Sequence, residues 1–386
     1  MTEKELSYFF PYKVDKENNF RYFINKRDEF IRRFIPNYDG TNVQEFLENK
    51  SSLSEAEKYD FLYLLENFGN WSWWFEHGKN IFSFSEDLLS MLEKSDVSEV
   101  TPDYFHLPYD IFYISLKPLN LKISKHSDAI IEGVYIDHNY WNPMGEHPEG
   151  FCDLSFHFVG DFKQIYLDFI PNVKSRLPYY IDKEEKFDES PLGSFWNVWF
   201  WFEKGEGREN VKQAVDYFLQ GLREEIFPKD NETEVTDFDL DFYNSTVELL
   251  KKTINLVINC MLYLSQPKEK IDIEEKYPSN LPNNFDKKLK FAKTVKEQKK
   301  LDEKIEKLGF TKVKYVGQSF RRNNQNLFSN SSVQSHWRRG HWRNQKYGEK
   351  LSLRKTIWIM PTIVNQEKGQ PKKGHIYDID EKTTTR

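Results

Sequence analysis

The sequence predicts an α+β protein: an acidic, mostly helical domain with a small antiparallel sheet, followed by a small basic α+β module. Apolar residues recur at helical spacing in residues 20–95 and 195–265, whereas residues 100–170 contain short runs of β-branched and aromatic residues. The charge also divides the chain. Residues 281–386 contain 25 Lys and Arg against 10 Asp and Glu, a net charge of +15, and the remainder has a net charge of −21.

The length and composition favour a folded chain of two domains. Its 386 residues exceed a typical single domain, and the 16% aromatic content is too high for a disordered chain. From the charge division and a proline-containing stretch we expect an acidic domain at 1–270, a linker at 271–282, a basic module at 283–375 and a flexible tail at 376–386.

The N-terminal third is expected to be helical. FRYFINKRDEFIRRFI, residues 20–35, places its apolar residues at helical spacing. Ser52 and Glu55 fit a capping box at the start of a further helix. The aromatic run at 70–75 is typical of a packed core, with a base-stacking surface as the alternative.

Three short runs at 111–116, 130–137 and 164–170 are predicted to be strands of an antiparallel sheet. The stretch between the last two contains His138, Glu146, His147, Glu149 and Asp153. These are metal-ligand types, but their spacing fits no helical metal motif, so we expect a polar hairpin loop.

Two apolar stripes, at 210–227 and 245–264, predict core-facing helices, and the acidic segment between them, 228–244, predicts a solvated loop. In the basic module, 286–310 reads as one charged helix that ends at Gly309, and 311–320 as a strand. The run TIWIM at 356–360 predicts a closing strand, because Pro361 is tolerated only at a strand end or edge.

Several classes of protein lack support in this sequence. Cys152 and Cys260 are far apart and belong to no CxxC pair, so we expect two ordinary thiols. No GxGxxG, GxxxxGK[ST], HExxH or GxSxG motif occurs, and we expect no cofactor and no metal. The N-terminal residues resemble no signal peptide, and no apolar run reaches about 18 residues, so we expect a cytoplasmic protein without membrane contact.

The candidate site is the basic aromatic stretch from Ser335 to Pro361. Arginine binds phosphate through paired donors, histidine transfers protons near neutral pH, and aromatic rings stack on bases. Gly340 disfavours a helix here. In an extended strand His336 and His341, five residues apart, face opposite sides, so the better cluster is His341 with Arg339 and Arg343.

The stretch and its neighbours supply two sets of candidate residues. The residues expected to contact nucleic acid are Trp337, Arg338, Trp342, Lys346, Arg354, Lys312, Lys314, Arg321 and Arg322. Those that would serve cleavage of RNA are His341, Arg339, Arg343, His336 and Tyr347. In that reaction the 2′-hydroxyl is the nucleophile, and an imidazole held between two guanidinium groups moves the proton.

Four interpretations follow. The first is nucleic-acid binding, RNA rather than DNA, with the acidic domain as a regulatory or partner-binding platform. The second is a toxin-like ribonuclease that needs no metal. The third is a structural cluster of cation–π contacts and ion pairs. The fourth is a protein–protein adaptor of a phage or defence system.

The residues HWRRGHWRNQKYG, 336–348, followed by LRKTIWIMPTIVN, 353–365, resemble a C-terminal module of uncharacterised proteins of bacterial phages, plasmids and related mobile elements. The resemblance covers about thirty residues. It implies a mobile-element context and assigns no activity.

Overall fold

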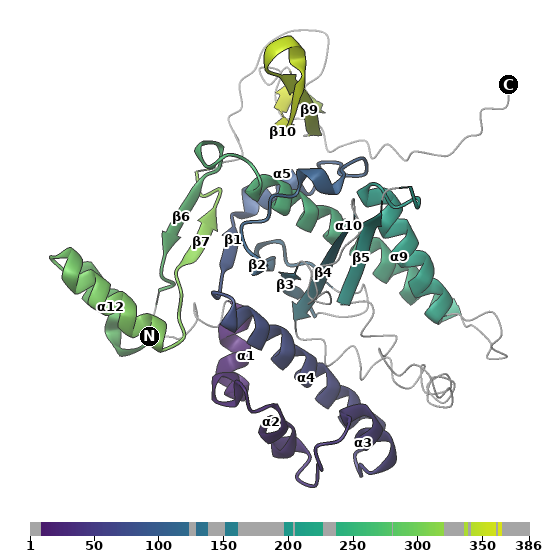
Figure 1. Ribbon diagram of the computed structural model, residues 1–386, viewed down its shortest axis with the longest axis vertical. Coiled ribbons are helices and arrows are strands. Elements are labelled where there is room, and N and C mark those ends of the chain that lie inside the picture. The colour runs from purple at the N-terminus through teal and green to yellow at the C-terminus, as the bar shows by residue number, and fades with distance from the viewer. Residues whose placement is uncertain are drawn as a thin grey trace.

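The computed structural model describes residues 9–122, 129–137, 151–160, 197–203, 205–226, 237–279, 281–319, 336–338, 341–359 and 362–364. It confirms the α+β class (Figure 1). The helices are α1 (Phe10–Asn18), α2 (Arg27–Phe34), α3 (Val43–Asn49), α4 (Glu55–Glu76), α5 (Glu86–Leu92), α9 (Val211–Ile226), α10 (Asp237–Leu264), α11 (Phe285–Phe291) and α12 (Val295–Lys307). No helix of these ranges combines the length and apolar composition that crossing a membrane requires.

The central element is a seven-stranded mixed sheet, in contrast to the small antiparallel sheet expected. Its strands are β1 (Ile81–Phe84), β2 (Ile111–Ser115), β3 (Ile131–Asp137), β4 (Phe151–Gly160), β5 (Asn197–Glu203), β6 (Ile273–Lys276) and β7 (Val313–Val316). Their spatial order is β5-β4-β3-β2-β1-β7-β6. β1 is parallel to both β2 and β7, and the other pairs are antiparallel. β1 can be parallel to β2 and to β7 because long stretches of chain separate it from both. A hairpin turn joins only antiparallel strands.

Residues from both sides of the expected linker share this sheet. β6 lies within 271–282, and β7 lies within the expected basic module, yet β7 pairs with β1 along its whole length, from Ile81 opposite Val313 to Phe84 opposite Val316. Partner choice between strands depends on contacts far apart in the chain, which residue patterns do not encode.

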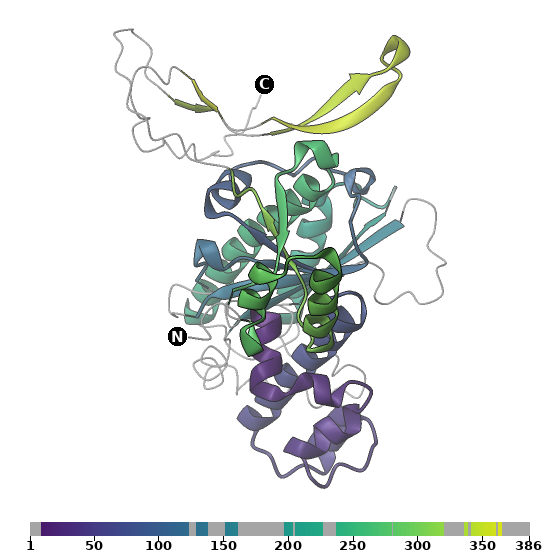
Figure 2. The ribbon, with the colours of Figure 1, turned by 90° about the vertical axis from the view of Figure 1, so that its left-hand side faces the viewer.

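Each face of the sheet is buried against helices (Figures 1 and 2). Phe82, Phe112 and Val134 belong to the core shared with α5, α9 and α10. Tyr113 and Tyr135 belong to the core shared with α1–α4. Successive side chains of a strand point to opposite faces, so β1, β2, β3, β4 and β7 each contribute to both cores.

The aromatic run at 70–75 lies in the N-terminal core, as the packing interpretation predicted. Trp71 and Trp74 are buried on α4. The Trp71 Nε1 donates to the carbonyl oxygen of Pro11 at 2.9 Å, and the Trp74 Nε1 donates to that of Asn80 at 2.9 Å. Both indole N–H donors are therefore satisfied inside the fold, and neither of these two rings is exposed for stacking on a base.

Helix boundaries differ from expectation at several points. The expected helix at 20–35 is a 3₁₀ turn (Phe20–Phe23) and α2, separated at Asn25, whose φ is +60°. α4 begins two residues later than expected, because Ser54 and Glu57 form the capping box. The expected loop at 228–244 is in part helix, since α10 begins at Asp237; acidic residues there suit the positive end of a helix dipole.

The charged segment at 286–310 is two helices rather than one. α11 ends at Phe291, and α12 begins after Thr294, whose side chain accepts from the Glu297 nitrogen in a second capping box. Gly309, with φ +88°, follows α12 as the sequence predicted.

Candidate nucleic-acid interface

The basic aromatic stretch forms a two-stranded antiparallel ribbon beyond the sheet (Figure 2). Its strands are β9 (His341–Tyr347) and β10 (Leu353–Ile359), with Tyr347 opposite Leu353 and His341 opposite Ile359. The chain turns between them through Gly348 and Lys350, both with positive φ. This part of the stretch is therefore extended, as Gly340 indicated.

The outer part of this ribbon presents cations and a phenol ring. Arg343, Lys346 and Tyr347 are exposed, and Tyr347 is 40% exposed. Alternation along the strand places Arg343 and Tyr347 on one face and Lys346 on the other. Arg354 lies opposite Lys346 in the register, which puts a second basic residue at the same position. Both faces of the ribbon thus carry positive charge.

Trp342 holds the ribbon to the body of the protein. It is partly buried against the core beneath α10, and its Nε1 donates to Oδ1 of Asn259 at 2.7 Å. Asn259 is fully buried, and its Nδ2 donates to the carbonyl oxygens of Ser95 at 2.9 Å and Asn255 at 2.9 Å. Trp342 is therefore a packing residue, and the base-stacking role expected for it is not the one it has here.

The two histidines lie in different pairs of strands. β8 (His336–Arg338) pairs with β11 (Thr362–Val364), where His336 lies opposite Val364, Trp337 opposite Ile363 and Arg338 opposite Thr362. His341 belongs to β9 and lies opposite Ile359. Arg339 lies outside the described residues, so of the expected cluster the structure places His341 and Arg343 on one strand.

The side chain of Lys314, which was expected to contact nucleic acid, instead contacts residues of the main sheet and its connecting loops. Its side chain is 13% exposed, and its Nζ donates to Oδ1 of Asn80 at 2.9 Å. The same Nζ lies 3.8 Å from Glu275 and 4.9 Å from the ring centroid of Tyr109. This geometry does not leave the ammonium group available to a phosphate. Arg321 and Arg322 lie outside the described residues.

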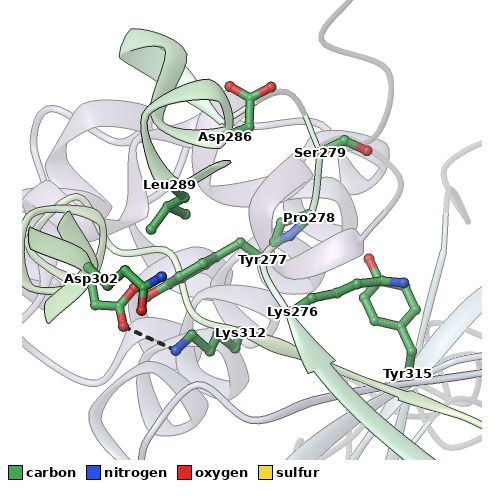
Figure 3. Close-up of a pocket in the computed structure, with 10 residues that line it drawn as sticks. Lys276, Tyr277, Pro278, Ser279, Asp286, Leu289, Asp302, Lys312 and Tyr315 are labelled. Atoms are coloured by element: carbon green, nitrogen blue, oxygen red, sulfur yellow. Dashed lines mark hydrogen bonds and ion pairs between the residues drawn. The ribbon is translucent and has the colours of Figure 1, made fainter. Parts of the chain in front are cut away.

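Lys312, the residue before β7, lines a pocket of about 490 Å³ between β6–β7 and α11–α12 (Figure 3). Its Nζ forms an ion pair with Asp302 at 3.1 Å and lies 5.3 Å from the ring centroid of Tyr277. Burial raises the pKa of Tyr277 above its ordinary value. The lining residues are Lys276, Tyr277, Pro278, Ser279, Asp286, Leu289, Gln298, Asp302, Lys312 and Tyr315, in which two cations face two carboxylates.

The balance of charge in this pocket argues against selection of a phosphate group. Lys276 has its own partner in Glu274 at 3.0 Å. Within the described residues no three His, Cys, Asp or Glu side chains converge as metal ligands would. His138, Glu146, His147 and Glu149 lie outside those residues, whereas Asp153 is buried on β4.

Sequence reasoning missed Asn259, because no motif marks it and its partner lies on a distant strand. It and Trp342 are 83 residues apart. One signal was available. The apolar period of α10 places Asn259 on the core side of the helix, and a buried amide requires hydrogen-bond partners.

Comparison with known proteins places the chain in a family. A family model described as AcrVA2-like, anti-CRISPR type V subtype A2, matches residues 82–366, a range that includes all but the first residue of β1 and the whole β9–β10 ribbon. A structure described as the crystal structure of AcrVA2 is similar at 13% identity, with a TM-score of 0.37, over 92% of this chain and 97% of the other. No curated protein matches the chain. The family match agrees with the expected phage and mobile-element context, and it covers most of the chain: this protein belongs to the AcrVA2-like family of type V anti-CRISPR proteins.

Proposed function

We propose that this protein counteracts a type V CRISPR system in the cytoplasm of a bacterial host, and that its β9–β10 ribbon binds RNA as part of that activity. The family match supports the first statement. The observation that carries the second is the exposure of Arg343, Lys346 and Tyr347 on a ribbon anchored through Trp342.

The arrangement suits RNA because cations track the phosphate backbone while an exposed ring stacks on an unpaired base. The ribbon is narrow and carries positive charge on both faces, so a flexible single strand can contact both faces. The acidic part of the chain, with a net charge of −21 outside residues 281–386, would repel nucleic acid and leave the basic part as its contact. We propose that this acidic part serves as the platform for a protein partner.

The ribonuclease hypothesis has less support. It requires His341 between Arg339 and Arg343, and a second acid would come from His336 or Tyr347. His336 and His341 lie in separate pairs of strands. We therefore favour binding over cleavage.

Two assays test the proposal. In a bacterium whose type V system clears a targeted plasmid, expression of the chain is expected to restore plasmid maintenance. The double variant Arg343→Glu/Lys346→Glu is expected to bind single-stranded RNA more weakly and to protect the plasmid less. The matched control is Lys268→Glu/Lys270→Glu, which makes the same charge change at exposed lysines before β6.

The outcomes separate the hypotheses. Plasmid loss with the unaltered chain would contradict the anti-CRISPR proposal. Equal RNA affinity in the ribbon variant and its control would contradict the ribbon's role. Protection of the plasmid without RNA affinity would favour the adaptor hypothesis, and shortened RNA after incubation would favour cleavage.

A further inference from the structure

A second basic surface lies on α11, the turn after it and the first six residues of α12; it is here called the lysine hairpin, residues 285–300. Its seven lysines are exposed: Lys287, Lys288, Lys290, Lys293, Lys296, Lys299 and Lys300. Asp286 and Glu297 are its acidic residues, which gives a net charge of +5. Figures 1 and 2 both show α12 beside the β6–β7 end of the sheet, away from the β9–β10 ribbon.

Within the described residues, no ion pair engages the lysines of the lysine hairpin. None of the seven lysines forms an ion pair with a described residue, whereas Lys276 and Lys314 on the adjoining strands and Lys312 just before β7 all do. Glu297 is occupied as a cap, since its carboxylate accepts from the Lys293 nitrogen at 3.0 Å and the Thr294 nitrogen at 3.3 Å. An uncompensated set of cations is the electrostatic footprint of a polyanion site.

The hairpin is a folded platform for these cations. Leu281, Phe285 and Ile305 are buried in a small core of their own, with Leu289, Leu301 and Leu308 packed against it. Arg21 donates to the carbonyl oxygen of Leu308, which ties the end of α12 to the N-terminal helices. The backbone that carries the lysines is therefore held in place before any ligand arrives, which reduces the entropic cost of binding.

Two apolar side chains project from the same surface. Phe291, at the end of α11, is 75% exposed, and Val295, at the start of α12, is 81% exposed. An aromatic ring among lysines can stack on a base while the ammonium groups contact phosphates. A membrane-binding surface would present a continuous apolar face, which two side chains do not provide.

We propose that the lysine hairpin is a second binding surface for single-stranded nucleic acid, independent of the ribbon, in which lysines contact phosphates without regard to sequence and Phe291 stacks on a base. A point charge on a flexible stem suits this role, because lysine binds phosphate without the directional demands of arginine. The ribbon and the lysine hairpin would then bind different segments of one nucleic-acid strand, and the affinity of the two together would exceed that of either alone.

The first measurement is the salt dependence of affinity for a fluorescent single-stranded oligouridylate RNA. The variant Lys287→Gln/Lys290→Gln/Lys296→Gln/Lys300→Gln removes four charges without removing helix-forming residues. The plot of log K against log salt has a negative slope. Each lost phosphate contact is expected to reduce the magnitude of that slope by about 0.7, so the variant's slope is shallower by up to about 3. The control Lys268→Gln/Lys270→Gln is expected to keep its slope.

The second measurement tests the ring. Phe291→Ala is expected to weaken RNA binding about tenfold, within the usual range for one stacked base, without change in the salt slope. Val295→Ala, at the neighbouring exposed position, is expected to leave the affinity unchanged. Circular dichroism of each variant checks that the helices remain formed.

Unchanged affinity and slope in the lysine variant would overturn the inference, as would equal binding of the unaltered chain to vesicles of anionic phospholipid or to polyglutamate. The ribbon variant Arg343→Glu/Lys346→Glu in the same assay separates this inference from the ribbon proposal. A loss confined to the ribbon variant contradicts the hairpin site alone, and a loss confined to the lysine variant contradicts the ribbon site alone.

Discussion

The indole nitrogen of Trp342 donates to the side-chain oxygen of Asn259 at 2.7 Å, and this contact links the ribbon to the buried side of α10. The amide of Asn259 is fully used, because its nitrogen also donates to the carbonyl oxygens of Ser95 and Asn255. One buried side chain thus connects the ribbon, α10 and the turn after α5.

Trp342→Phe is expected to lower the free energy of unfolding by about 1–3 kcal/mol, because Oδ1 of Asn259 is left buried without a donor. The amides of β9 and β10 are expected to exchange hydrogen faster in the variant, since the ribbon loses its anchor. Denaturant unfolding and hydrogen exchange measure the two effects. The control is Trp199→Phe at a side chain that is 44% exposed, and a similar loss there would argue against the anchor.

Lys314→Met is expected to leave RNA affinity unchanged and to lower the free energy of unfolding by about 1 kcal/mol, because Oδ1 of Asn80 loses its donor. Lys346→Met, at an exposed position of the ribbon, is expected to do the reverse: weaker RNA binding with little change in stability. Fluorescence anisotropy and urea unfolding measure both. If Lys314→Met weakens binding as much as Lys346→Met does, the assignment of Lys314 to the sheet's own contacts is wrong.

Thr294→Ala is expected to destabilise α12 by about 1 kcal/mol, because the Glu297 nitrogen loses the hydroxyl that accepts from it at 3.2 Å. Thr294→Ser keeps this hydroxyl and should behave like the unaltered chain. Hydrogen exchange of the first turn of α12 measures the effect, and equal exchange in both variants would show that the cap contributes nothing.

The two thiols are expected to react slowly with an aromatic disulfide reagent at pH 8 and rapidly after unfolding. Burial raises the pKa of Cys152 to about 12 and also raises that of Cys260. Because the raised pKa keeps each thiol protonated in the folded chain, its contribution to stability is fully present below the unfolded pKa of about 9 and is lost as the pH rises towards 12. Cys152→Ser/Cys260→Ala should show a smaller decline over that range, and an identical decline would contradict this account.

Local patterns predicted the helices that bury a regular apolar stripe. They failed where two nearby residues could both begin a helix, or where one helix and two helices fit the same pattern. α9 begins and ends within a residue of its expected bounds, because Val211, Ala214 and Leu222 keep the helical period. The capping box was placed at Ser52, two residues before the actual Ser54, since both serines are followed three residues later by glutamate. The periodicity through 286–310 hid the break at Thr294, where a cap outweighs continuation of one helix.

Contacts between residues far apart in the chain could not be predicted from the sequence. The parallel pairing of β7 with β1 and the bond from Trp342 to Asn259 join segments more than 80 residues apart, and single-sequence patterns carry no pairing information. Arg343, Lys346 and Tyr347 were predictable as exposed residues, because their spacing and polarity describe a solvated strand. Lys312 and Lys314 could not be distinguished from them by residue type. Only the structure shows that Lys314 contacts Asn80 and Glu275 and that Lys312 forms an ion pair with Asp302.

The position of β7 between β1 and β6 has a consequence for how this chain is made. A ribosome produces β1 and its first neighbour β2 early, but the second neighbour of β1 arrives only with Val313–Val316. Until then the backbone of Ile81–Phe84 presents an open edge, the kind of surface on which incomplete chains associate. A chain that ended before Val313 would still contain the lysine hairpin, but it would lack both β7 and the β9–β10 ribbon, and β1 would stay unpaired on that side.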